Sequence, residues 1–235
     1  MARTRRLALV AGVFYLLTIV ASFTGAALLA PVLGHPDYVL GAGRDTQGLG
    51  GGLLYLVNVA ACVGTAVALF PVVRRRHEGA AIGFVASRLM EAAIITVGVL
   101  ALLSVVTLRR EVGNASVVGV ATGFVALRDW TFLLGDSLMP AINALLLGSV
   151  LYRARLVPRW IPALGLIGAP LQLAAVVAAL LRADERVTWL AAIAVVPIFL
   201  WELSLGVRLV GWGFRPAAVA AQEPEAAPAR VLQPI

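Results

Sequence analysis

Six long apolar stretches limit what this sequence can fold into. The hydrocarbon core of a bilayer is about 30 Å thick, and a helix needs about 20 apolar residues to cross it. Six stretches are long enough, at about residues 7–33, 51–73, 80–108, 130–152, 160–181 and 187–210. We therefore predict an all-α, polytopic membrane protein built as a bundle of six transmembrane helices.

The composition agrees with a membrane protein and excludes a nucleic-acid-binding one. Of the 235 residues, 61% are hydrophobic and 13% are charged, whereas soluble domains are about half apolar and a quarter charged. The net charge of +7 would suggest nucleic acid in a soluble chain. Here the basic residues sit in short connections between apolar stretches, so we expect membrane lipid as a partner and no nucleic acid.

The arginines predict the orientation of the bundle. Twelve lie near the N-terminus, in the second and fourth connections and at or beyond the end of the sixth stretch, whereas six lie in the other three connections. Since the side richer in arginine faces the cytoplasm, we predict cytoplasmic termini and a bacterial plasma membrane location. We assign residues 1–214 to the transmembrane domain. Residues 215–235 are rich in Ala, Pro and Glu, which predicts a disordered cytoplasmic tail.

The third connection, from Arg109 to Asp129, is the longest. Its part from Val117 to Leu127 is apolar but too short to cross a bilayer. Two alternatives fit this pattern: a helix lying on the outer surface of the membrane, or a re-entrant segment.

Cofactor, metal and enzyme signatures are missing from the sequence. Cys62 is the only cysteine, and His35 and His77 fall in connections on opposite sides of the predicted bundle. A cysteine cluster and a haem held by two histidines are therefore excluded, and we predict no cofactor and no metal. The sequence also has no Gly-Lys phosphate loop and no Gly-x-Ser-x-Gly motif, so we do not expect an enzyme.

Ionisable side chains inside the apolar stretches are the candidate functional residues, because such groups are costly in a membrane. Arg88 and Glu91 lie three positions apart and share a helix face. Glu202 and Asn143 lie at a similar depth in other helices, which predicts one polar cluster. Asp136 lies about two helical turns farther out than Asn143 and marks a candidate outward-facing polar cavity.

The charges of this predicted cluster do not balance. One arginine accompanies two glutamates, and an uncompensated buried carboxylate is expensive. One glutamate should therefore hold a proton or bind a cation. The leading hypothesis is a protein that binds or moves a small ligand or a proton through this cluster. One alternative is a structural or regulatory membrane protein whose cluster only pins helices, and a second is an intramembrane enzyme that acts on lipid.

Small residues and prolines predict how the helices pack. Gly165 and Gly168 in the fifth stretch favour close approach of a neighbouring helix. Pro170 and Pro197 predict kinks in the fifth and sixth helices.

Three segments carry a resemblance to a known family. These are Arg88-Leu89-Met90-Glu91, the run from Leu156-Val157-Pro158-Arg159-Trp160 to Gly168, and the run from Trp201-Glu202 to Gly213-Phe214. Together they resemble the bacterial multi-pass membrane proteins classed as domain of unknown function 4386. The resemblance extends from the first helix to Phe214. It implies a membrane protein of this topology and implies no mechanism.

Overall fold

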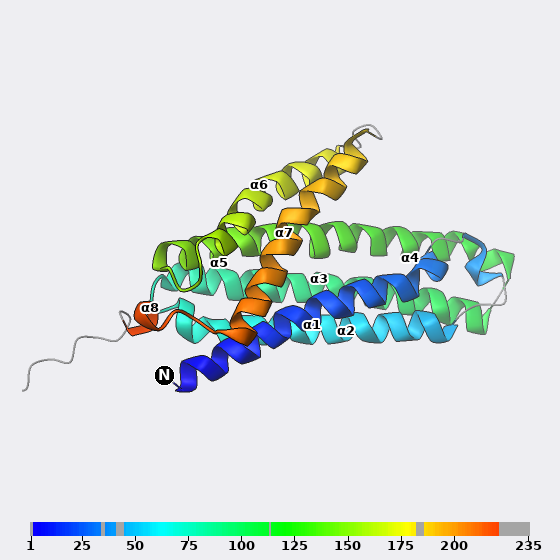
Figure 1. Ribbon diagram of the computed structural model, residues 1–235. Helices are drawn as coiled ribbons and strands as arrows, with labels where there is room; N and C mark the ends of the chain where they lie inside the picture. Colours follow the sequence, from blue (N-terminus) through cyan, green and yellow to red (C-terminus); the bar gives the residue numbers. More distant parts are fainter. Residues whose placement is uncertain (1, 34–35, 41–44, 113, 182–185, 221–235) are drawn as a thin grey trace, which may run out of the picture.

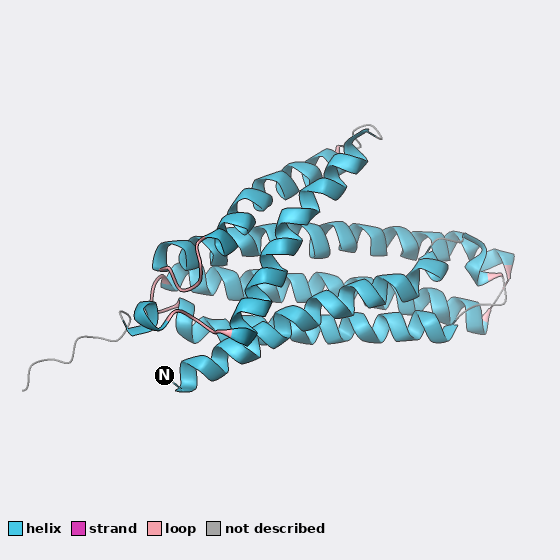
Figure 2. Cartoon of the chain, viewed as in Figure 1, coloured by secondary structure: helices cyan, strands magenta, loops and turns pink. Residues whose placement is uncertain are grey.

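The computed structural model is helical throughout its described part. It describes residues 2–33, 36–40, 45–112, 114–181 and 186–220, and every regular element among them is a helix (Figure 2). Six helical segments are long and apolar enough to cross a membrane. The predicted all-α fold with six candidate transmembrane helices is confirmed.

The helices follow one another with short connections. In chain order they are α1 (Ala2–Leu33), η1 (Pro36–Val39), α2 (Asp45–Val73), α3 (Glu78–Glu111), η2 (Ala115–Val117), α4 (Val118–Thr131), η3 (Phe132–Leu138), α5 (Met139–Ala154), α6 (Trp160–Leu180), α7 (Arg186–Gly211) and α8 (Pro216–Ala220). His35 and the arginines at positions 44 and 182 lie outside the described residues.

Four long helical segments run alongside one another, and a helix pair crosses them. Figure 1 shows α1, α2, α3 and the α4–α5 segment side by side, while α7 crosses at an oblique angle with α6 next to it. The closest helix pairs include α1 with α2, α2 with α3, and α6 with α7. Helix α7 also packs on α1, so the first and last long helices are neighbours in space.

The predicted surface or re-entrant segment at 117–127 is wrong. Residues 115–154 form one continuous helical stretch made of η2, α4, η3 and α5. The residues at the expected break, Arg128 to Thr131, include neither glycine nor proline, so nothing there stops the helix. Its 40 residues span about 60 Å, about twice the thickness of a bilayer core.

A π-helical turn, η3, joins α4 to α5. Pro140 has no N–H to donate to the carbonyl of Asp136, four residues earlier. The chain shifts to a wider turn before it, in which the Met139 N–H donates to the Leu134 carbonyl five residues back. Such turns inside α-helices are frequent at functional sites, and this one carries Asp136.

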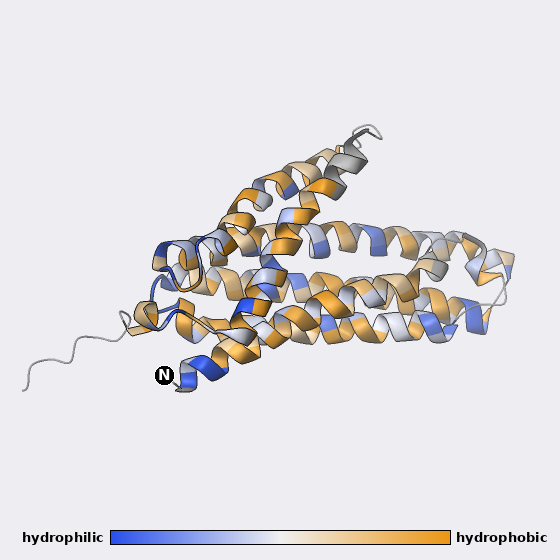
Figure 3. Ribbon diagram, in the orientation of Figure 1, coloured by the Kyte–Doolittle hydropathy of each residue, from blue (hydrophilic) through white to orange (hydrophobic). Residues whose placement is uncertain are grey.

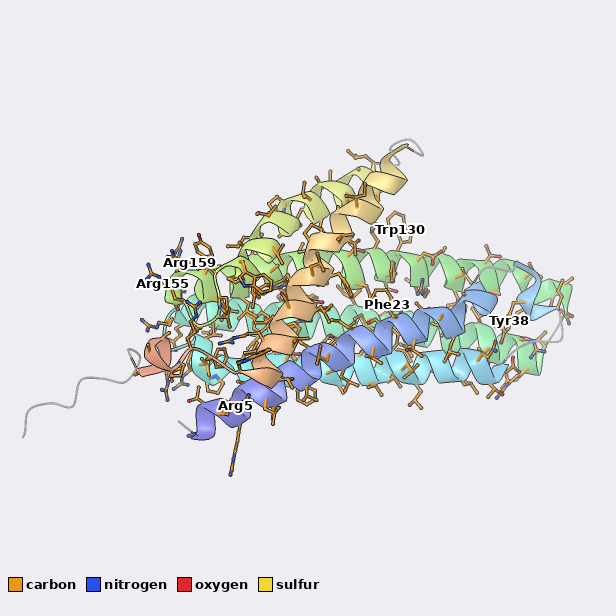
Figure 4. The ribbon with its side chains drawn as sticks, in the orientation of Figure 1. Arg5, Phe23, Tyr38, Trp130, Arg155 and Arg159 are labelled. Atoms are coloured by element: carbon orange, nitrogen blue, oxygen red, sulfur yellow. The ribbon has the colours of Figure 1, made fainter. Side chains whose placement is uncertain are left out.

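Both described chain ends lie at the same end of the bundle, which we call the terminal end. Figure 4 shows Arg5 there, as well as Arg155 and Arg159 from the connection between α5 and α6. The Arg5 guanidinium donates to the carbonyls of Leu209 and Val210 at 2.8 and 2.7 Å. These are orphan carbonyls at the C-terminus of α7, where a positive charge is favourable.

Part of the predicted tail is helical. Residues 216–220 form α8, and the Arg215 N–H donates to the Leu156 carbonyl at 2.8 Å. Val219 is buried. Residues 221–235 lie outside the described part of the chain.

The surface of the bundle matches a lipid environment. Figure 3 shows apolar residues along most of each long helix, with hydrophilic residues gathered near the ends and a smaller number near the middle. Large apolar side chains such as Val20, Val67 and Ile167 are more than half exposed. Lipid, unlike water, tolerates such a surface.

Candidate functional site

Three helices bring the predicted polar cluster together near the middle of the bundle. Arg88 Nη1 donates to both carboxylate oxygens of Glu91 at 3.1 Å, and Arg88 Nη2 donates to Glu202 Oε1 at 3.1 Å. Asn143 Nδ2 donates to Glu91 Oε2 at 2.6 Å. We call Arg88, Glu91, Asn143 and Glu202 the central cluster. It joins α3, α5 and α7.

Arg88 is enclosed by aromatic rings and apolar side chains. It is 1% exposed, and its guanidinium carbon lies 5.0 Å from the centre of the Tyr15 ring and 5.8 Å from that of Phe84. Rings at this distance attract a cation through their quadrupoles. Arg88 Nη1 also lies 3.6 Å from the sulfur of Cys62. The arginine therefore has contacts from α1, α2 and α3 in addition to its ion pair with α7.

Glu202 is placed by the packing of its neighbour Trp201 against α6. Trp201 is 1% exposed, and a methyl group added at Gly165 would lie 2.8 Å from the Trp201 ring. Only glycine therefore leaves room for the indole. Because successive residues of a helix differ by about 100° around the axis, Trp201 on α6 leaves Glu202 free to point toward α3. The close packing predicted for Gly165 and Gly168 is present at this interface.

A cavity of about 250 Å³ lies beside the central cluster. Its polar lining includes Arg88, Glu91, Glu202, Asp136 and Asn58. Its other lining residues are Thr18, Ile19, Ser22, Phe23, Ala26, Tyr55, Phe132, Pro140, Val195, Ile198 and Phe199. The cavity therefore has a charged wall and an apolar, aromatic wall, which is the usual make-up of a small-molecule site.

Among the described residues, one polar side chain of this cavity has no hydrogen-bond partner, and a second has only a weak one. Asp136 accepts no hydrogen bond and forms no ion pair within 4.0 Å there. Asn58 is 3% exposed, and its one side-chain contact in the described chain is a long one, from the Cys62 sulfur to Oδ1 at 3.7 Å. Buried polar groups are normally hydrogen-bonded. The cavity therefore offers unused polar contacts.

The charged residues of the cavity are predicted from the sequence, whereas its aromatic residues and the π-helical turn are not. The predicted residues Arg88, Glu91, Asn143 and Glu202 form the cluster, and Asp136 lines the cavity beside it as well as a neighbouring pocket. The aromatic residues Phe23, Phe132 and Phe199 were not singled out, because an aromatic residue in an apolar stretch carries no signal of its own. The sequence feature that indicates η3 is Pro140, because a proline cannot donate a hydrogen bond to the carbonyl of the acidic residue four positions earlier.

A second polar cluster lies at the opposite end of the bundle from the termini. Asp45 Oδ2 accepts from Arg109 Nη1 at 2.6 Å and from Arg110 Nε at 3.0 Å. Tyr38 donates its hydroxyl to Asp45 Oδ1 at 2.6 Å, and Figure 4 shows Tyr38 at that end. Burial, followed by the contact with Asp45, raises the pKa of Tyr38 well above its ordinary value. We call Tyr38, Asp45, Arg109 and Arg110 the end cluster.

The described residues do not form a metal site. No group of three or more His, Cys, Asp or Glu side chains in that part of the chain could hold a metal ion. Cys62 is buried and lies between Asn58 and Arg88. The carboxyl groups of the cavity are instead placed around one arginine.

The chain can now be compared with known proteins. The profile of the domain of unknown function DUF4386 matches residues 10–213. The chain belongs to this family. The match covers all six candidate transmembrane helices, and with them the central cluster and the cavity. No curated protein and no solved structure is significantly similar to the chain.

Proposed function

We infer that this DUF4386 protein binds a small ligand or exchanges a proton in the cavity beside the central cluster. One observation carries the proposal: a single arginine, Arg88, shares the cavity wall with three carboxyl groups, those of Glu91, Glu202 and Asp136. A salt bridge that only joins helices needs no surplus of charge. Surplus carboxylates in a low-dielectric site must be neutralised by a proton or a cation.

The cavity also gives such a ligand a place to bind. Its volume of about 250 Å³ suits one small molecule. It lies among helices that are long and apolar enough to cross a membrane. The arginine distribution supports a plasma membrane protein with cytoplasmic termini, in which the terminal end faces the cytoplasm.

The alternative, a structural protein whose cluster only pins helices, has its own support. Arg88 is 1% exposed and connects α3 with α7, which lie far apart in sequence. Removing one partner of a buried ion pair usually destabilises a protein strongly. Both roles predict a loss of stability, so stability alone does not distinguish them.

The dependence of melting on pH does distinguish them. If the folded bundle holds a proton that the unfolded chain releases, linkage requires the melting temperature to fall as the pH rises. Glu202→Gln keeps the shape of the side chain and removes one carboxyl group. We expect this variant to flatten the pH dependence of melting in detergent, whereas Glu111→Gln, at an exposed position of the same helix as Arg88, leaves it unchanged.

The opposite result would support the structural alternative. In that case wild type and Glu202→Gln give parallel pH profiles, and the variant melts at a uniformly lower temperature. Such a result contradicts the proposal of ligand or proton binding.

A further inference from the structure

The polar wall of the cavity is suited to a positive charge. Glu91 and Glu202 share one arginine, and Asp136 has no hydrogen bond and no ion pair within 4.0 Å in the described chain. The other arginine near Asp136 is Arg128, which lines a neighbouring pocket with it and forms its ion pair with Asp129. Asn58, which is 3% exposed, lines the same cavity, and its Oδ1 accepts a hydrogen bond at 3.7 Å from the Cys62 thiol, which is a weak donor. In their ionised form these carboxylates would repel an anion, whereas a cation would neutralise their surplus charge without a proton.

The aromatic part of the lining is suited to an apolar body that carries this charge. Phe23 of α1 and Phe199 of α7 pack edge to face, with ring centres 5.6 Å apart. Both line the cavity, together with Phe132 and Tyr55. Aromatic rings bind organic cations through cation–π attraction, which strengthens when water is excluded. A small inorganic ion would make no use of this part of the lining.

The edge of the cavity lies at the outer surface of the helices. Phe23 is 62% exposed, and Phe132 and Val195 are each 43% exposed. These cavity-lining residues belong to α1, η3 and α7, within the candidate membrane spans. Phe23 faces the space between α1 and the α4–α5 segment in Figure 4. Exposed apolar side chains in a membrane span contact lipid, so the cavity borders the lipid phase.

From these three observations we propose that the ligand is a small organic cation with an apolar body, which reaches the cavity from the lipid phase. Its charged group lies between Asp136 and the carboxylates of the central cluster, and its body lies against Phe23 and Phe199. This inference rests on the proposed function and names the class of ligand for the same cavity. It requires no chemical change in the ligand.

The test compares two molecules of the same shape and different charge. Benzyltrimethylammonium is the cationic probe, and neopentylbenzene is its uncharged carbon analogue. Wild-type protein is placed in nanodiscs of zwitterionic phosphatidylcholine, so that lipid charge does not attract the probe. We expect the cation to raise the melting temperature and to be retained as a radiolabelled ligand, and the neutral analogue to do neither.

Variants of Asp136 locate the charge that is recognised. Asp136→Asn should weaken binding of the cation about tenfold or more, as expected when a buried charge loses its partner. Asp136→Glu keeps the charge and should keep binding, and Glu111→Gln serves as the distant control. If Asp136→Asn does not fold, competition by protons in wild type replaces it. Binding should weaken as the pH falls from about 8 to about 5, because burial in an apolar site makes a carboxylate take up a proton at a higher pH than in water.

The inference is overturned if the neutral analogue binds as well as the cation, or if Asp136→Asn binds with unchanged affinity. It is also overturned if wild-type binding does not respond to pH. Absence of cation binding together with a pH-dependent melting step that Glu202→Gln removes would overturn this inference alone and leave proton exchange standing. Absence of both would overturn the proposed function as well.

Discussion

The central cluster and the end cluster both join helices, but they differ in exposure and in which charge lies at their centre. In the central cluster one arginine that is 1% exposed contacts two carboxylates, and a third lies in the adjoining cavity. In the end cluster one carboxylate contacts two arginines, and the Arg110 side chain is 51% exposed. Solvent and lipid headgroups can screen the charges at the end of the bundle, whereas a surplus charge in the buried central cluster has neither.

This difference indicates what each cluster is for. The end cluster ties the start of α2 to the end of α3 and needs no ligand to do so. In the central cluster Glu202 joins α3 to α7 and Glu91 joins α3 to Asn143 of α5. Asp136, which lines the adjoining cavity, joins no helices in this way, and the proposed binding accounts for its presence there. Substitutions that alter one cluster at a time test this difference, and the one with the largest expected effect on stability comes first.

Removing the central arginine should have the largest effect. Arg88→Gln leaves two glutamates close together without a cation, and we expect it to lower the free energy of unfolding by about 3–5 kcal/mol. The matched change in the end cluster, Arg110→Gln, should cost less than about 1 kcal/mol, because the side chain is half exposed. Unfolding by titration with sodium dodecyl sulfate measures both. Equal losses would remove the distinction between the clusters.

Displacing α7 should weaken the central cluster without touching its charges. Gly165→Leu places a side chain where the Trp201 ring lies, and overpacking of this kind costs about 1–3 kcal/mol. The control is Gly119→Leu on α4, since nothing lies within 4 Å of that position. We expect Gly165→Leu to lower the melting temperature and to flatten its pH dependence as Glu202→Gln does. A destabilised variant with an unchanged pH profile would show that Glu202 is not held by this packing.

Salt should reduce the contribution of the end cluster to stability and leave that of the central cluster unchanged. Asp45→Asn removes the carboxylate of the end cluster and should cost about 1–2 kcal/mol at low ionic strength. At about 1 M salt, where the screening length is about 3 Å, this cost should shrink. The cost of Arg88→Gln should not change with salt, because the central cluster is buried. The experiment is thermal melting of both variants at low and high salt. A salt-independent cost for Asp45→Asn would contradict the assignment of the end cluster to a solvated region.

Much of the fold and of the charged wall could be predicted from sequence, for physical reasons. Long apolar stretches must be helices that cross the membrane, and charged residues such as Arg88 and Glu202 within them must find partners. The continuity of α4 into α5 could not be predicted from hydropathy, because Arg128 and Asp129 look like a loop although both are compatible with a helix. The end cluster was missed because Asp45 and Arg109 lie outside the apolar stretches, where a charged residue is ordinary and does not require a partner. The apolar wall of the cavity, with Phe23 and Phe199, depends on the crossing of α1 and α7, which no local pattern encodes.

The most direct test of the central claim is to observe the surplus carboxyl group itself. Infrared difference spectroscopy during a pH titration distinguishes a protonated carboxyl group from an ionised one. For ligand-free protein in lipid we predict a protonated carboxyl signal that disappears as the pH rises and is lost when Glu91, Glu202 and Asp136 are all replaced by their amides. If wild type and this triple variant give the same spectra, the cavity holds no titrating carboxyl group, and the central cluster is only a pin between helices.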